Sequence, residues 1–213
     1  LGGAASMRAR ASLIMAAKVP VRLRLLIPTV ENAVSADAYR PGDVLQTRKG
    51  LTVEVGNTDA EGRLILCDAL ALAAEDDPDL VIDFATLTGA ARIALGTELP
   101  AMFCSDSKIA EAVRKTIEKN SGDPDPLWHM PLFEPYRRHL RSYIADIHNI
   151  DNVGKGGAIT AALFLREFVG KKTPWIHVDT MAWNARAQPG RPEGGEVFGV
   201  RTMFRMLQAR YAK

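Results

Sequence analysis

The sequence lacks the features that mark several common classes of protein. Only two cysteines occur in its 213 residues, and both Cys67 and Cys104 lie in apolar surroundings, so we expect buried thiols rather than a disulfide. No apolar run approaches the length of a membrane span, because Arg8, Arg10 and Lys18 interrupt the first helical stretch. The formal net charge of +2 gives no electrostatic reason to expect a nucleic acid as the main partner.

Several chemical signatures are missing as well. The four histidines form no zinc-type pair, and His177, inside a predicted strand, is interpreted as a core residue. Residues 154–157 precede a predicted helix but lack the spacing of a phosphate-binding loop, so they indicate tight packing at the helix start. Residues 137–141 form a short basic cluster that is typical of a solvated helix face. The chain contains no internal repeat, low-complexity tract or interdomain linker.

What is present is a regular alternation of apolar strands and helices, which predicts an α/β fold with a largely parallel central sheet and helices on both faces. The length fits one domain. Strands are expected at 21–27, 51–55, 80–85, 101–104 and 175–179, and helices at 2–17, 64–74, 88–95, 106–120, 134–141, 158–169 and along a C-terminal stripe of Val197, Val200, Phe204, Leu207 and Tyr211.

The carboxyl ends of strands are where sites form in such sheets. Residues 59–63, 86–89 and 179–183 each follow a predicted strand, so we expect them to share one edge. Within the first group Asp59, Glu61 and Arg63 alternate, and in extended backbone every second side chain points the same way. Two carboxylates on one face suit a metal ion with oxygen ligands, and the guanidinium suits an anion or a developing negative charge.

Spacing alone leaves two other interpretations of this segment open. It is compatible with a solvated loop. It is also compatible with a capping Asp59 and a first-turn Glu61, which would stabilise the helix that follows through its macrodipole.

The whole octapeptide Asn57–Leu64 resembles the signature of the leucyl aminopeptidase family. Other segments resemble that family in the order in which it uses them: 40–44, 49–55, 83–90, 156–165 and 175–179. The resemblance extends from the first residues to the C-terminal helix. It implies an aminopeptidase/phosphorylase-like catalytic domain, two-metal removal of N-terminal residues from peptides, a cytoplasmic location and a homohexamer.

The resemblance also implies roles for the signature residues. Asp59 and Glu61 would bind two divalent metal ions, Mn²⁺ or Zn²⁺, with Glu61 bridging them. Arg63, together with Gly62 and Leu64, would hold a bicarbonate that acts as general base toward the attacking water. A guanidinium is suited to this task because it grips a planar oxyanion with two parallel hydrogen bonds.

Further residues are implied to bind the substrate. Thr86, the Leu87 carbonyl and the Gly89 amide would form a wall for the peptide, although the residues by themselves indicate only a strand-to-helix turn. Met181 stands where relatives of this family usually carry a small residue. We therefore expect a narrowed pocket for the N-terminal side chain, and this departure puts the leucine preference of the family name in doubt for this sequence.

The first residues resemble an internal part of the family. Leu1–Ala5 is similar to a helix start that follows a metal-binding Asp, so residues 1–213 are expected to be the C-terminal portion of the catalytic domain, with the N-terminal domain and the first catalytic segment absent. The remaining acidic ligands and both family lysines are not among these residues, so the chain alone is expected to be inactive. Two alternatives are a two-metal phosphate-ester hydrolase, for which phosphate-cradling residues are lacking, and a non-catalytic structural or DNA-associated relative.

Overall fold

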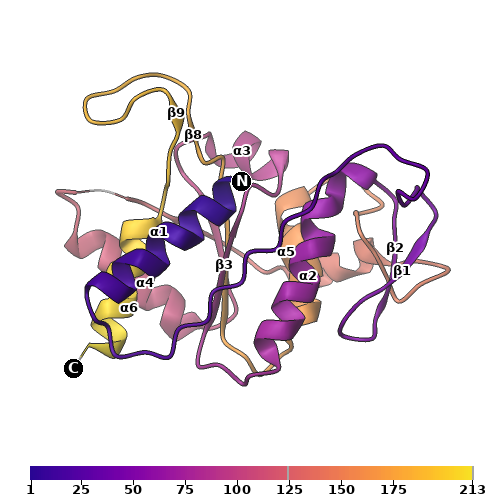
Figure 1. The fold of residues 1–213 in the computed structure, drawn as a ribbon, viewed down its shortest axis with the longest axis horizontal. Coiled ribbons are helices and arrows are strands. Elements are labelled where there is room, and N and C mark those ends of the chain that lie inside the picture. Colours follow the sequence, from indigo (N-terminus) through magenta and orange to yellow (C-terminus); the bar gives the residue numbers. More distant parts are fainter. Residues whose placement is uncertain (124, 213) are drawn as a thin grey trace. The chain divides into compact units, whose positions relative to one another are not determined.

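The computed structural model describes residues 1–123 and 125–212, which fold into two compact units. The first unit is built from Leu1–Leu25, Ile82–Met130 and the stretch that begins at Ile176, and the second from Leu26–Val81 and Pro131–Trp175. The chain therefore leaves the first unit and returns to it twice (Figure 1). Of the helices described, none is long and apolar enough to cross a membrane.

The four-stranded sheet of the first unit has the order β3 (Val81–Ala85), β7 (Trp175–Asp179), β4 (Ala101–Cys104) and β5 (Trp128–Met130). β4 pairs parallel with β5 and antiparallel with β7, so the sheet is mixed and the prediction of a largely parallel sheet is wrong. All residues of β7 are buried. A strand buried on both faces gives a continuous apolar run whichever way its neighbours run, so periodicity cannot reveal its orientation.

The helices of this unit are α1 (Gly2–Ala16), α3 (Gly89–Leu95), α4 (Ser107–Lys119) and α6 (Val200–Tyr211). α6 packs against both α1 and α4 (Figure 1). It buries Val200, Met203, Met206 and Leu207, so only Val200 and Leu207 of the predicted stripe lie on the buried face. Phe204 and Tyr211 are half-buried, and Val197 precedes the helix. The carboxylate of Asp106 accepts hydrogen bonds from the amides of residues 108 and 109, so the predicted cap of α4 is also confirmed. A short antiparallel pair, β8 (Trp183–Asn184) and β9 (Gly194–Gly195), completes the unit.

The second unit contains a three-stranded mixed sheet with the order β1 (Val44–Gln46), β2 (Thr52–Glu54) and β6 (Ile147–His148). β2 is antiparallel to β1 and parallel to β6. α2 (Glu61–Ala74) packs on α5 (Gly157–Val169), and two 3₁₀ helices are present, η1 (Thr58–Ala60) and η2 (Glu134–Leu140). α5 is a core helix of this unit, since nine of its side chains are buried. The helix predicted at 134–141 is present as the 3₁₀ helix η2.

The predicted strand at 21–27 is not formed. These residues have no regular secondary structure, and Leu23, Leu25 and Ile27 are 40%, 37% and 37% exposed. Alternation of arginine and leucine describes a half-buried strand only where a neighbouring strand supplies hydrogen bonds, and none of the described strands pairs with this segment.

Two smaller predictions about side chains are confirmed. The two cysteines form no disulfide with each other; Cys67 is buried in α2, as expected, whereas Cys104 is only half-buried in β4. Burial, followed by the charge of Asp68, raises the pKa of the Cys67 thiol, which makes it a poor nucleophile. His177 is fully buried, and its Nδ1 lies 2.5 Å from Oδ1 of Asp83, so it is a core histidine.

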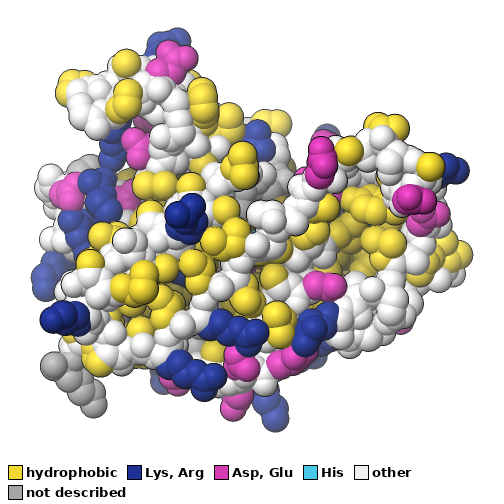
Figure 2. Space-filling view, in the orientation of Figure 1, with side chains coloured by type: hydrophobic (Ala, Val, Ile, Leu, Met, Phe, Trp, Pro, Cys, Tyr) yellow, Lys and Arg dark blue, Asp and Glu magenta, His cyan; other side chains and the backbone are white. Residues whose placement is uncertain are grey.

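The surface of the molecule carries charges of both signs. Figure 2 shows hydrophobic side chains reaching the surface between lysines, arginines and carboxylates. The mixture of charges on this face agrees with the nearly neutral composition.

The start of α1 approaches the end of β3 so closely that it has room only for glycine. A Cβ atom added at Gly3 would lie 2.2 Å from the carbonyl oxygen of Phe84. We expect Gly3→Ala to lower the free energy of unfolding by about 1–3 kcal/mol, the usual cost of overpacking, as measured by denaturant unfolding. Gly122→Ala is the matched control, since a Cβ there meets nothing within 4 Å. Equal effects of the two substitutions would contradict this account.

Candidate functional site

The alternation of charged residues predicted an extended backbone for Asn57–Leu64, but the segment is helical from Thr58 onward. Oδ1 of Asn57 accepts a hydrogen bond from the amide of Asp59 at 2.9 Å, which starts η1, and α2 begins at Glu61. Glu61 and Arg63 therefore lie in the first turn of a helix, where residues two apart do not face each other. The shared-face argument is wrong because the capping residues that follow β2 favour a helix start over a strand.

Both candidate metal ligands are accessible from solvent. Asp59 is exposed, and Glu61 is half-buried with Oε2 accepting a hydrogen bond from Nδ2 of Asn32 at 3.0 Å. The pKa of the Tyr39 phenol is raised, first by partial burial and second by the nearby negative charge of Glu61. Carboxylates at a helix N-terminus are stabilised by the helix dipole, so their placement suits the capping role as well as metal binding.

Arg63 points into the second unit. It is 9% exposed, and its Nη1 donates a hydrogen bond of 2.6 Å to the carbonyl of Asn149. Its guanidinium also lies 6.0 Å from the ring centroid of Phe164 on α5, within cation–π range. These contacts fix the start of α2 against the rest of the unit.

Asn149 organises this region and was missed by sequence reasoning. It is fully buried, and Oδ1 accepts hydrogen bonds from the amides of Gly56 and Asn57 at 2.7 and 3.3 Å. Its Nδ2 donates to the Asn57 carbonyl at 2.8 Å. One side chain thus satisfies the backbone of the turn from β2 into η1. A single asparagine in a loop carries no sequence signal for such a role.

A second organised turn follows β3 in the first unit. Oδ1 of Asp179 accepts hydrogen bonds from the amides of Leu87 and Thr88 at 3.0 and 3.1 Å, and its Oδ2 accepts one from Oγ1 of Thr88 at 2.5 Å. Oγ1 of Thr88 in turn accepts a hydrogen bond from the amide of Ala91 and caps α3. The predicted meeting of residues 86–89 with the end of β7 is therefore confirmed.

This network also orients the Leu87 carbonyl. No peptide bond between the described residues is cis. In a trans peptide the C=O and the following N–H point in opposite directions. Because the Thr88 amide points at Asp179, the Leu87 carbonyl points away from it. The turn thus fixes the direction of this acceptor.

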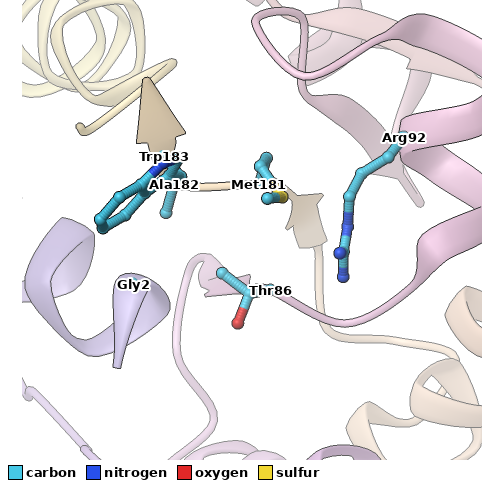
Figure 3. A pocket seen from close by; sticks show the side chains of 6 residues that line it. All are labelled: Gly2, Thr86, Arg92, Met181, Ala182 and Trp183. Carbon is cyan, nitrogen blue, oxygen red and sulfur yellow. The ribbon is translucent and has the colours of Figure 1, made fainter. Parts of the chain in front are cut away.

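A pocket of about 340 Å³ lies beside this turn (Figure 3). It is lined by Gly2, Thr86, Arg92, Met181, Ala182 and Trp183. The pocket brings together Thr86 and Met181, which the sequence had assigned to one substrate surface. Leu87 and Gly89 do not line it. Trp183 lies in the segment 179–183 that was expected at this edge, whereas Arg92 was not anticipated, since it stands in no position that the motifs marked.

The described residues contain no group of three or more His, Cys, Asp or Glu side chains arranged to hold a metal ion. Asp59 and Glu61 are thus a pair of candidate donors and not a complete site. They belong to the second unit, whereas the turn after β3 and the pocket belong to the first. The common edge expected for all three segments stays a prediction.

Comparison with solved structures identifies the fold. The crystal structure of the cytosol aminopeptidase from Coxiella burnetii matches with a TM-score of 0.94 and 54% sequence identity, covering 98% of this chain and 45% of that one. The bottromycin maturation enzyme BotP in complex with Mn matches with a TM-score of 0.89 and 39% identity, covering 98% of this chain and 46% of that one. The chain therefore has the α/β architecture of an aminopeptidase catalytic domain.

Sequence comparison makes the family specific. The catalytic-domain model of the cytosol aminopeptidase family matches residues 1–204. A probable cytosol aminopeptidase of Synechococcus sp. (strain CC9605) is 40% identical over 210 residues, which is 98% of this chain and 42% of that protein. The chain belongs to the cytosol aminopeptidase family and is homologous to its leucyl aminopeptidases, which are metal-dependent exopeptidases. It spans less than half the length of these relatives.

The role of Asp179 in shaping the turn can be tested by substitution. Asp179→Ala leaves three donors without their acceptor in a buried site, so we expect the free energy of unfolding to fall by about 3 kcal/mol or more. Asp179→Asn keeps an oxygen for the two amides and should recover part of that loss. Chemical denaturation of both variants measures the effect, and equal stability of Asp179→Ala and the unaltered protein would contradict the assignment.

Proposed function

We propose that this chain is part of a metal-dependent aminopeptidase that removes N-terminal residues from peptides in the cytoplasm. The proposal rests on two observations: a structural match that covers 98% of this chain and 45% of a cytosol aminopeptidase, and solvent-accessible oxygen donors in the signature Asn57–Leu64. The chain covers only part of its relatives, so the proposal concerns the protein expressed from its complete reading frame.

Asp59 and Glu61 are the proposed metal ligands of this chain. Their carboxylates are accessible and suit Mn²⁺ or Zn²⁺, and the relative BotP was crystallised with Mn. Two carboxylates cannot fill the coordination shells of two ions, so we propose that further ligands come from outside the described residues. Bound divalent ions supply polarisation of the scissile carbonyl and a water of lowered pKa.

Loss of either carboxylate should reduce metal affinity. We expect Asp59→Asn and Glu61→Gln, in the protein from the complete reading frame, each to weaken Mn²⁺ binding by at least about tenfold in a calorimetric titration, since each removes an anionic ligand. Asp43→Asn is a matched control, because Asp43 is also exposed in this unit and its Oδ2 accepts a hydrogen bond from the amide of Arg40 instead. Unchanged Mn²⁺ affinity in both site variants would refute the ligand assignment.

Arg63, with Gly62 and Leu64, is proposed to hold a bicarbonate that accepts a proton from the attacking water. The chemistry of the guanidinium and the place of Arg63 in the first turn of α2 support this role. The bond to the Asn149 carbonyl gives the side chain a fixed orientation, which an anion-binding group needs. The same bond means that Arg63 also stabilises the unit, so the two contributions must be separated.

The catalytic and the stabilising contributions of Arg63 can be separated because they affect different measured quantities. Arg63→Ala should lower kcat by about ten- to a thousand-fold at full metal occupancy, the usual contribution of a positioned acid–base or oxyanion group. A purely structural Arg63 would instead lower the melting temperature and leave the kcat of the folded fraction near normal. Measuring kcat, metal content and melting temperature on the same samples distinguishes them, and wild-type turnover at full occupancy would refute the catalytic role.

Substrate contacts are proposed for the first unit. The Leu87 carbonyl, presented by the Asp179 network, would accept a hydrogen bond from the peptide. The Gly89 amide, at the start of α3, would donate one, because a helix leaves its first amides without intrahelical acceptors. Thr86 and Met181 would line the pocket for the N-terminal side chain, with Met181 narrowing it.

Assembly into a homohexamer is proposed by resemblance, and light scattering of the complete protein tests it.

A further inference from the structure

The pocket beside the turn after β3 contains one charged group. Of its six lining residues only Arg92 carries a charge, and no carboxylate is among them. Arg92 lies in α3, three residues after the turn that Asp179 holds. Figure 3 shows its side chain on the side of Met181 opposite to Trp183. A cation is thus placed in a pocket whose other lining side chains are small, apolar or a hydroxyl.

One donor of the Arg92 side chain lacks an acceptor among the described residues. This donor is Nε, which is buried. A buried donor without an acceptor costs free energy, and that cost is recovered when an acceptor binds. A guanidinium recovers it best with a carboxylate, since two parallel N–H groups fit two oxygens.

The remaining walls restrict what can carry that carboxylate. Met181, Ala182 and Trp183 provide apolar contact for methylene groups, and the Thr86 hydroxyl can donate a second hydrogen bond. Gly2 closes the pocket at the start of α1, where a Cβ atom would lie 2.4 Å from Cβ of Ala182. The space therefore suits a short aliphatic chain that ends in a planar anion.

We propose that Arg92 makes this pocket select a carboxylate, namely the side chain of an acidic N-terminal residue such as glutamate. The inference rests on the proposed aminopeptidase function and names the substrate class of that site. A second source of the same chemistry is the terminal carboxylate of a dipeptide. The pocket that contains Thr86 and Met181 is the one assigned to the N-terminal side chain, which favours the first source.

The test compares substrates of equal shape and different charge. In the Mn²⁺-loaded protein from the complete reading frame, kcat/KM for glutamate α-amide should exceed that for glutamine α-amide by about tenfold or more, the discrimination expected of a charge-assisted hydrogen bond. Arg92→Met should abolish this ratio, and Arg92→Lys should retain part of it. Arg8→Met is the matched control, because Arg8 is exposed on α1 and does not line the pocket, and it should leave the ratio unchanged.

Further arms identify the source of the carboxylate. A ratio of one in the unaltered protein, or a ratio that Arg92→Met does not change, overturns the proposal. If Arg92→Met instead lowers activity on leucyl-leucine but not on its C-terminal amide, Arg92 binds the terminal carboxylate and the side-chain assignment is overturned. Met181→Ala should admit bulkier side chains while keeping the preference for glutamate over glutamine.

A failure of the proposed aminopeptidase function would give a different experimental result from a failure of the Arg92 assignment. If no amino acid amide is hydrolysed, the aminopeptidase proposal fails, and equilibrium binding then decides the pocket independently. L-glutamate should bind more tightly than L-glutamine in a calorimetric titration of the unaltered protein, and this difference should disappear in Arg92→Met. Equal affinities for the two amino acids would overturn the assignment of Arg92.

Discussion

The candidate substrate wall depends on the carboxylate of Asp179. This group ends β7 in the buried layer of the first unit and accepts three hydrogen bonds from the turn that follows β3. Two oxygen atoms thereby fix the Leu87 and Thr88 amides, the rotamer of Thr88 and the first turn of α3. The direction of the Leu87 carbonyl follows from these bonds, and so does the position of Arg92 one helical turn later.

In the second unit a neutral side chain, that of Asn149, holds the turn after β2 in the way that the Asp179 carboxylate holds the turn after β3. Asn149 ties the backbone of residues 56 and 57 through both ends of its amide, and its own carbonyl accepts a hydrogen bond from Arg63. An amide can donate and accept at once, which suits a turn that exposes both an N–H and a C=O. In both units the loop that carries candidate chemistry is held by a buried polar side chain distant in sequence, so the chemistry rests on rigid supports.

Sequence reasoning predicted what is local. The helices at 106–120 and 158–169, the cap at Asp106, the lack of a disulfide between the two cysteines and the family were all available from periodicity, composition or motif. Strand orientation was not, because β4 has one parallel and one antiparallel neighbour and three of its four residues are buried in either case. The segment at 21–27 failed for a related reason, since strand pairing is decided by a partner and not by the segment itself.

The candidate site shows the same division. Asp59, Glu61 and Arg63 were selected by their types and order, but their geometry was mistaken, because Asn57 starts a helix where alternation indicated a strand. Asn149 contributes through contacts across more than ninety residues of sequence to residues 56 and 57. Arg92 differs from both, because it stands out only through a buried Nε that has no hydrogen-bond partner among the described residues, and such an absence leaves no mark in a sequence.

The aromatic side chain of Trp183 at the edge of the pocket has an optical consequence. The three tryptophans occupy distinct environments, with Trp175 fully buried and Trp128 and Trp183 57% and 47% exposed. Indole emission shifts to longer wavelength as water reaches the ring, so the spectrum combines a blue component from β7 with redder ones from β5 and β8. Only the β8 fluorophore lines the pocket. The chain thus carries its own reporter of pocket occupancy, without any attached label.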